Sequence, residues 1–318
     1  MAALLEIRDL RIAFPHASGM AEAVRGVTLD VQPGEAVGLV GESGSGKTLT
    51  ALAVMRLIDA PGRIVGGSIR FRGQEVLSLS DAECRRLRGR QISMIFQDPL
   101  TSLNPAFTVG RQLVDVIVTH QGISRRLAAA RAAEVLSVVG IPRPERRLAS
   151  YPHEFSGGMR QRVLIGMAVA CRPSLLIADE PTTALDVTIQ AQVIALIRRL
   201  RVELGLSVLF ITHNLDLVAE FCDRVAAMYA GAVMEEAPTE ALFSTPRHPY
   251  TRALIRCVPR LGESGVTLDS IEGAPPSPGS ALAGCAFASR CPIVMDRCWT
   301  EAPPLRAVGS QRVACWAA

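Results

Sequence analysis

Apolar residues along this chain either alternate with polar ones, run together in short blocks, or recur every three to four positions. The first two patterns predict strands at Leu4–Ala13, Val24–Val31, Ala36–Val40, Ser68–Arg72, Ile92–Phe96, Leu175–Ala178 and Val208–Thr212. The third predicts helices at Leu49–Ile58, Asp81–Arg90, Arg125–Val139, Val163–Cys171, Val187–Leu204, Asn214–Phe221 and His248–Cys257. A polar loop containing His16–Glu22 is expected to join the first two strands.

The order of these elements predicts a parallel sheet with helices packed on it, because strands alternate with helices. Within this α/β core, alanine- and leucine-rich segments between about 98 and 172 predict an inserted helical subdomain. The composition shifts again near Phe243, and a linker-like stretch follows over Gly262–Gly279. We therefore expect one domain over 1–245 and an irregular C-terminal extension over 246–318.

Composition narrows the function classes. The chain has 318 residues, of which 49% are hydrophobic, and a net charge of only +4 with scattered arginines, which does not predict nucleic-acid binding. The apolar stretches are too short to span a bilayer, and the N-terminal region has no secretory pattern. We expect a cytoplasmic protein that serves a membrane, if at all, from its surface.

A phosphate-binding loop is predicted where the strand Ala36–Val40 leads through a glycine-rich turn into a helix. The turn is Gly41-Glu42-Ser43-Gly44-Ser45-Gly46-Lys47-Thr48. Its glycines let several backbone N–H groups converge on one anion, and the helix N-terminus adds partial positive charge. Lys47 would reach the β- and γ-phosphates, and the Thr48 hydroxyl would bind Mg²⁺. The alternative is an ordinary glycine-rich turn, which the flanking strand and helix disfavour.

An acidic pair follows a second buried strand at Leu175–Glu180. Asp179 would hold Mg²⁺ through water, and Glu180 is placed to orient or deprotonate the attacking water. A buried strand that merely ends in two solvated acids is the alternative. The phosphate loop upstream favours the Mg²⁺ interpretation.

A second anion cradle is predicted at Ser156-Gly157-Gly158, ahead of the helix Val163–Cys171. One chain rarely needs two cradles for one triphosphate. A dimer in which each chain's second cradle closes its partner's nucleotide would use both. The simpler interpretation is a helix cap, with Ser156 as the N-cap.

Four cysteines cluster near the C-terminus, at Cys285, Cys291, Cys298 and Cys315. A disulfide framework is not expected in a reducing compartment, so the cluster indicates metal or cofactor ligation. The spacings are wider than the usual zinc pairs, and four thiolates can equally hold a [4Fe–4S] cluster. Zinc, an iron–sulfur cluster and free thiols all stay open on spacing alone.

Taken together, these motifs resemble the ATP-binding subunit of ABC transporters over about three quarters of the chain. Gly41–Thr48 matches Walker A, Gln97 the Q-loop glutamine, Ser156-Gly157-Gly158 the signature, Leu175–Glu180 Walker B, Ala184-Leu185-Asp186 the D-loop and His213 the switch histidine. The resemblance implies a P-loop NTPase (RecA-like) core with an N-terminal antiparallel β-sheet and an inserted α-helical subdomain. It also implies ATP and Mg²⁺ as ligands.

The resemblance assigns further roles. Phe14 would stack on adenine, with a core residue of the first sheet as the alternative, and Gln97 would bind Mg²⁺ and the attacking water. His213 would contact the γ-phosphate, and Asp186 would bridge to the opposite chain. The signature departs from its commonest form at two positions, since Phe155 replaces leucine and Met159 replaces glutamine.

Three segments resemble the oligopeptide/dipeptide branch, which includes nickel importers: Gln97–Pro105, His153–Arg162 and Thr245–Thr251. This branch implies an ATPase for peptide uptake, peripheral at the cytoplasmic face of the inner membrane. It implies a related second ATPase subunit, two integral membrane permease subunits and an extracytoplasmic binding protein, with no nucleic acid. Its cysteine motif favours an iron–sulfur cluster over zinc.

Three alternatives remain in view. The first is the ATPase of a nickel or other small-solute importer of the same branch. A soluble ABC scaffold usually carries two cassettes or a coiled-coil insertion, and neither is present in this sequence. A hydrolysis-dead partner is disfavoured because both Glu180 and His213 are present.

Overall fold

A computed structural model describes residues 2–16, 19–97, 102–183, 185–257, 270–277, 280 and 282–318. The chain divides into two compact units. The first unit consists of Met1–Val31, Ala36–Leu77 and Phe210–Ala318, and the second consists of Gln32–Glu35 and Ser78–Leu209. Three predicted features lie partly outside the described residues: Asp98–Thr101 after the Q-loop glutamine, Ala184 of the D-loop, and much of the linker.

The first unit contains the expected N-terminal antiparallel sheet. Its strand order is β2-β1-β4-β5, with bounds β1 Leu5–His16, β2 Gly19–Val31, β4 Arg63–Phe71 and β5 Gln74–Glu75. Leu5 pairs with Val31 on one side and with Phe71 on the other. The predicted polar loop over 16–22 is wrong for most of its length, because Gly19–Glu22 continue β2 in register with the end of β1.

The first unit also carries a mixed group of strands. β3 (Ala36–Val40) pairs in parallel with β9 (Arg224–Tyr229). β10 (Ala232–Pro238) pairs antiparallel with β9 and with β12 (Gln311–Val313). β12 also pairs antiparallel with β11 (Arg306–Val308). The sequence predicted β3 but none of the other four. The helices are α1 Lys47–Val54, α9 Leu215–Phe221, α10 Thr239–Ser244, α11 Pro249–Arg256, α12 Arg297–Thr300 and a 3-10 helix at Ala288–Arg290.

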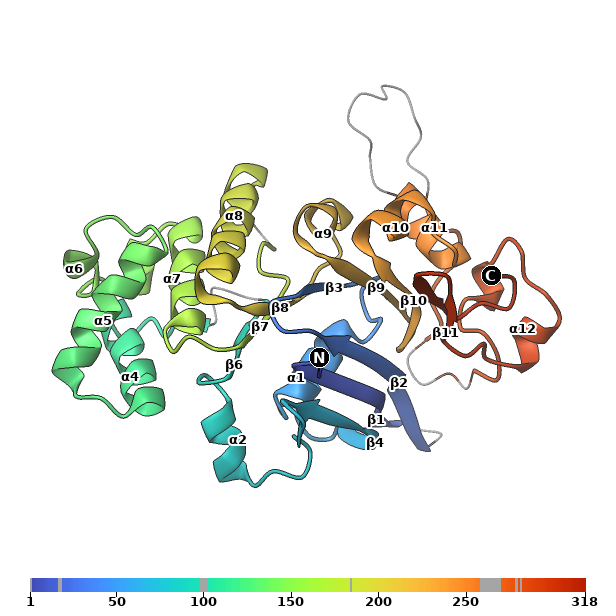
Figure 1. The fold of residues 1–318 in the computed structure, drawn as a ribbon, viewed down its shortest axis with the longest axis horizontal. Coiled ribbons are helices and arrows are strands. Elements are labelled where there is room, and N and C mark those ends of the chain that lie inside the picture. Colours follow the sequence, from blue (N-terminus) through green and yellow to red (C-terminus); the bar gives the residue numbers. More distant parts are fainter. Residues whose placement is uncertain are drawn as a thin grey trace. The chain divides into compact units, whose positions relative to one another are not determined.

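The second unit pairs β6 (Ile92–Ile95) in parallel with β7 (Leu175–Asp179), and a run of helices separates these two strands along the chain (Figure 1). Its helices are α2 Asp81–Leu87, α4 Val109–Gln121, α5 Arg125–Val138, α6 Pro144–Arg147, α7 Gly157–Val169, α8 Val187–Leu204 and a 3-10 helix at Pro152–Glu154. The expected helical segment between the two strands is thus present. Its last helix begins at Gly157, not at Val163 as predicted, because Ser156 caps it.

Burial follows the expectation for parallel strands. Every residue of β3 and of β7 is buried, and so is every residue of β8 (Ser207–Ile211), which runs across the boundary between the two units.

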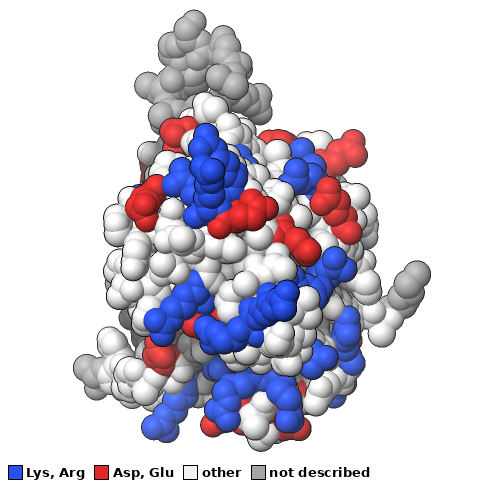
Figure 2. Space-filling model, turned by 90° about the vertical axis from the view of Figure 1, so that its left-hand side faces the viewer, with Lys and Arg blue, Asp and Glu red and all other residues white. Residues whose placement is uncertain are grey.

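At the exposed face that carries α4–α6, basic and acidic side chains are interspersed (Figure 2). None of the helices in the described part of the chain combines the length and the apolar character of a membrane-spanning segment.

Candidate nucleotide site

The predicted phosphate loop joins β3 to α1 in the first unit, in the expected strand–loop–helix context. Gly46 is the N-cap of α1 and has a φ of 99°, which a residue with a side chain rarely adopts. Gly41 has a φ of 149°, and a Cβ at this position would lie 2.0 Å from the carbonyl oxygen of Met228. The loop therefore needs glycine at Gly41 because the end of β9 approaches its backbone.

Lys47 points back into the loop. Its Nζ donates to the carbonyl oxygens of Gly41 (2.8 Å) and Glu42 (2.9 Å) and to Ser45 Oγ (3.3 Å), and the residue is 6% exposed. Ser43, Gly44 and Thr48 are exposed. The loop thus holds a buried ammonium group against its own carbonyls, beside exposed backbone.

The other two candidates of the first unit differ in exposure. Phe14 is half-buried on β1, and its ring lies against Gly62, whose missing side chain leaves room for it. His213 is exposed and directly precedes Asn214, the N-cap of α9, whose side chain accepts from two backbone N–H groups of that helix. These positions leave the adenine and γ-phosphate roles as predictions.

In the second unit, the acidic pair sits at the end of β7. Asp179 is 1% exposed, and Glu180 has a φ of 46°, a backbone conformation that costs a non-glycine residue energy. Glu180 Oε2 accepts from Gln97 Nε2 (3.0 Å) and from Thr183 Oγ1 (2.8 Å). The structure therefore brings together two of the sequence candidates, Gln97 and Glu180.

The signature serine is a helix cap, as the simpler interpretation predicted. Ser156 Oγ accepts from Met159 N at the first turn of α7, and Ser156 and Gly157 are exposed. Asp186 likewise caps α8, since its carboxylate accepts from Ile189 N at 2.9 Å. An exposed helix N-terminus keeps its partial positive charge, so the cap and the anion-cradle interpretations are compatible.

One buried polar residue near the signature was missed by the sequence analysis. Gln161 on α7 is fully buried, and its Nε2 donates to the carbonyl oxygen of Pro181 at 2.5 Å. This bond ties the signature helix to the residue that follows Glu180. Gln161 lies two residues before the predicted helix Val163–Cys171, so the apolar pattern of that helix carried no signal for it.

The four C-terminal cysteines line one cavity of the first unit, together with His248 and Phe287. Burial raises the pKa of the Cys285 and Cys291 thiols, and the neighbouring thiols of the cluster raise it further. Among the described residues, no group of three or more His, Cys, Asp or Glu side chains is arranged to hold a metal ion. This arrangement of the described side chains supports neither the zinc nor the iron–sulfur interpretation.

Known proteins match this chain along nearly its whole length. The ABC transporter family model matches residues 24–183, and the model for the oligopeptide/dipeptide transporter C-terminal region matches residues 234–298. The dipeptide transport ATP-binding protein DppD of Haemophilus influenzae is 46% identical over 313 residues, 98% of this chain and 95% of the relative. The oligopeptide transport ATP-binding protein OppD of Salmonella typhimurium is 48% identical over 314 residues, 98% and 93% of the two chains.

Solved structures agree with the sequence comparisons. A dimeric ATP-binding cassette in a post-hydrolysis state with ADP and Pi superimposes with a TM-score of 0.66 at 26% identity, covering 74% of this chain and 98% of that cassette. The P-loop NTPase fold class is thereby confirmed, and so is ATP hydrolysis as the activity of this chain. The chain belongs to the ABC transporter ATP-binding proteins, and it carries the C-terminal region of the oligopeptide/dipeptide transporters.

Proposed function

We propose that this chain hydrolyses ATP to drive the import of di- or oligopeptides across a membrane. The observation that carries the proposal is the occurrence of both family regions in one chain, the cassette at 24–183 and the oligopeptide/dipeptide region at 234–298. The relatives named above are dipeptide and oligopeptide transport proteins. A nickel or other small-solute importer of the same branch is the second candidate.

The roles within ATP hydrolysis are proposed residue by residue. The loop Gly41–Thr48 binds the phosphates, Phe14 the adenine and His213 the γ-phosphate, while Glu180 acts as general base. Mg²⁺ would be held by Thr48, Gln97 and Asp179, and hydroxyl, amide and carboxylate oxygens are ligands that suit this ion. When bound, the ion neutralises phosphate charge. The proposed cassette domain spans 1–245, with its helical subdomain at about 98–172, and the extension spans 246–318.

The proposed assembly is a pair of cassettes below two integral membrane permease subunits. Ser156, Gly157 and Gly158 would contact the nucleotide of the opposite cassette, and Asp186 would bridge to it. A dimeric solved cassette supports pairing in general. The second cassette is proposed to be a related but different chain, and both would sit at the cytoplasmic face, served by an extracytoplasmic binding protein.

The cysteine cavity is proposed to hold a [4Fe–4S] cluster. Four thiols line one cavity, and four thiolates are the usual ligand set of such a cluster. No group of side chains among the described residues is arranged to hold a metal ion, so the proposal rests on the number of the thiols and on their common cavity. Iron and sulfide analysis of anaerobically purified protein, with an absorption spectrum, tests the proposal. A colourless, zinc-loaded preparation would overturn it.

Transport itself is tested with the assembled complex. Affinity purification from detergent-extracted membranes should recover two membrane proteins and a second ATPase with this chain. After reconstitution into vesicles, a cognate binding protein loaded with peptide should stimulate ATP hydrolysis and accompany uptake of labelled peptide. Stimulation by a nickel-loaded binding protein, and not by peptide, would favour the second candidate. Recovery without any membrane protein would favour a soluble scaffold.

A further inference from the structure

The second residue of the phosphate loop, Glu42, is tied to the C-terminal extension by two side chains. The Glu42 backbone N–H donates to the Tyr250 hydroxyl at 3.0 Å, and Arg290 Nη1 lies 3.0 Å from Glu42 Oε2. Tyr250 is fully buried, and the Arg290 side chain is 5% exposed. Both contacts lie within the first unit, so they bring the extension directly to the phosphate loop.

Arg290 is fixed in place by several acceptors. It ends the 3-10 helix Ala288–Arg290, directly before Cys291. Its Nε donates to the carbonyl oxygen of Glu272 (2.9 Å), Nη2 to that of Ile271 (3.0 Å) and Nη1 also to the Tyr229 hydroxyl (3.1 Å). A guanidinium held by this many bonds offers Glu42 a charge whose position is set before any nucleotide arrives.

Tyr250 connects the loop to β9. Its hydroxyl accepts from Glu42 N–H and donates to the Met228 carbonyl oxygen at 3.4 Å, the same oxygen that excludes a side chain at Gly41. Its ring packs against Tyr229 and Phe287, with centroids 4.7 and 5.5 Å away. Burial raises the pKa of Tyr250, which keeps the hydroxyl protonated and able to donate.

The charge of Glu42 matters because a phosphate loop receives a polyanion. A carboxylate in the loop repels a triphosphate unless a cation offsets it, and Arg290 is such a cation. The Glu42 carbonyl oxygen also accepts from Lys47 Nζ at 2.9 Å. The orientation of Glu42 therefore affects both the charge of the loop and the position of its lysine.

We infer that Arg290 and Tyr250 are positioning residues for ATP binding, through which the C-terminal extension sets the charge and shape of the phosphate loop. The inference rests on the proposed role of that loop in binding ATP. Neither residue needs to touch the nucleotide. Arg290 neutralises Glu42, and Tyr250 orients the Glu42 backbone.

The test is a set of variants whose affinities for Mg-ATP are measured by competition with a fluorescent ATP analogue. Arg290→Met should weaken ATP binding about tenfold, equivalent to about 1.4 kcal/mol, because it leaves the Glu42 carboxylate unpaired. The double variant Glu42→Gln/Arg290→Met should recover to within about twofold of the parent, since the repulsive charge is gone. Tyr250→Phe should also weaken binding, because the Glu42 N–H loses its acceptor.

Two features separate this role from simple folding of the extension. The effect of Arg290→Met should be larger for ATP than for ADP and absent for adenosine, because it depends on phosphate charge. Arg312→Met is the matched control, since it removes an arginine of the same extension that pairs with Glu236 and not with the loop. It should lower thermal stability and leave ATP affinity unchanged.

Two results would overturn the inference: unchanged ATP affinity in Arg290→Met, or a double variant that binds as weakly as the single one. The second result would reduce Arg290 to a structural role, because both proteins lack the same arginine. The proposed function fails in a different way. A parent protein that binds no Mg-ATP, or a Lys47→Ala variant that binds it as well as the parent, would remove the phosphate-loop role and the inference with it.

Discussion

Glu180 offers the sharpest test of the proposed chemistry, because its surroundings allow a substitution that preserves two of its hydrogen bonds. Gln97 Nε2 and Thr183 Oγ1 both donate to the same carboxylate oxygen, Oε2. A glutamine that places its amide oxygen at this position keeps both hydrogen bonds. Glu180→Gln therefore removes the charge and the basicity of this side chain with little change in its position.

The expected loss follows from the role of a general base. Proton transfer of this kind contributes about 10²- to 10⁴-fold to a rate, so kcat should fall by at least about 100-fold, or about 3 kcal/mol in barrier. ATP affinity should be unchanged or higher, because a negative charge next to the phosphates is removed. The loss should therefore appear in kcat and not in KM.

The assay is phosphate release by the assembled complex at saturating ATP, with nucleotide binding measured separately. Glu203→Gln is the matched control, since it makes the same change on an exposed side chain of α8 that pairs with Arg199. It should hydrolyse ATP at the parent rate. If Glu180→Gln also keeps the parent rate, Glu180 is not the base. If it loses ATP binding as well, the substitution has disturbed the site and the reasoning from Oε2 is wrong.

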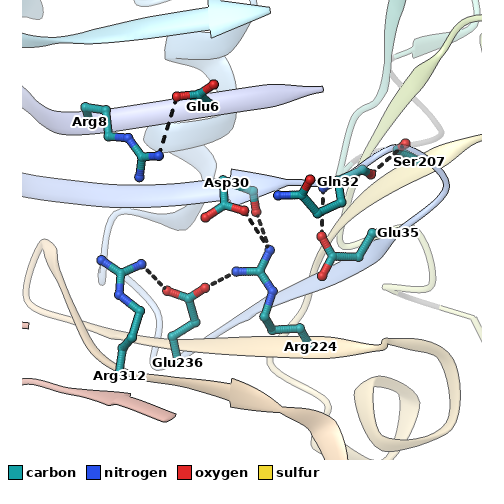
Figure 3. Close-up of polar contacts among 9 residues, drawn as sticks. All are labelled: Glu6, Arg8, Asp30, Gln32, Glu35, Ser207, Arg224, Glu236 and Arg312. Carbon is teal, nitrogen blue, oxygen red and sulfur yellow. Dashed lines mark hydrogen bonds and ion pairs between the residues drawn. The ribbon is translucent and has the colours of Figure 1, made fainter. Parts of the chain in front are cut away.

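Three further predictions concern the scaffold, each measured as the free energy of unfolding in urea. Gly41→Ala should cost well over about 1 kcal/mol, because its Cβ would lie 2.0 Å from the Met228 carbonyl oxygen. The control Gly34→Ala has open space around the new Cβ and should cost only the strain of its positive φ. Equal costs for the two variants would contradict the steric argument. Glu236→Gln should cost about 3 kcal/mol, because the Glu236 side chain is 3% exposed and pairs with Arg224 and Arg312 (Figure 3). The exposed pair Arg8–Glu6 is the control, and Glu6→Gln should cost under about 1 kcal/mol. Burial lowers the pKa of His248 to about 4 from 6.5, while its Nδ1 accepts from Tyr250 N. The folded state then binds fewer protons than the unfolded state between these values, so stability should fall by about 2 kcal/mol from about pH 7.5 to 5. His248→Asn keeps a capping acceptor and should flatten that slope; a slope equal to the parent's would assign it to other groups.

Much of the fold was predictable because its signals are local. The strand Ala36–Val40 is short and wholly apolar, and the turn after it is glycine-rich, so β3, the loop and α1 were expected in order. The N-terminal strands were expected from alternation and found as an antiparallel sheet. The capping role of Ser156 was also expected, since serine before a helix is a common N-cap.

The missed strands had no comparable local signal. Every residue of β9 except the first is buried, so its polar and apolar residues do not alternate. Two of its six residues are alanines, which have a low strand propensity. β11 and β12 have three residues each, and β12 is held by pairing with residues of β10 that lie 76 and 78 positions earlier in the chain. Pairing over such separations determines these strands, and a local pattern cannot contain it. The early start of α7 was missed because glycine is a poor helix former, whereas the cap at Ser156 offsets that preference.

The same distinction applies to the candidate site. Motif residues are contiguous in sequence, so their types and order can be recognised, but the partners that orient them are remote. Glu42 is held by residues more than 200 positions away, Tyr250 and Arg290, and Glu180 by Gln97, 83 positions earlier. When the extension is removed, a phosphate loop of unchanged sequence therefore loses the contacts with Tyr250 and Arg290 that fix its shape and charge. Substitutions of Cys291 should therefore change the affinity for nucleotide. Arg290 directly precedes Cys291 and pairs with Glu42, and the Glu42 carbonyl oxygen accepts from Lys47 Nζ.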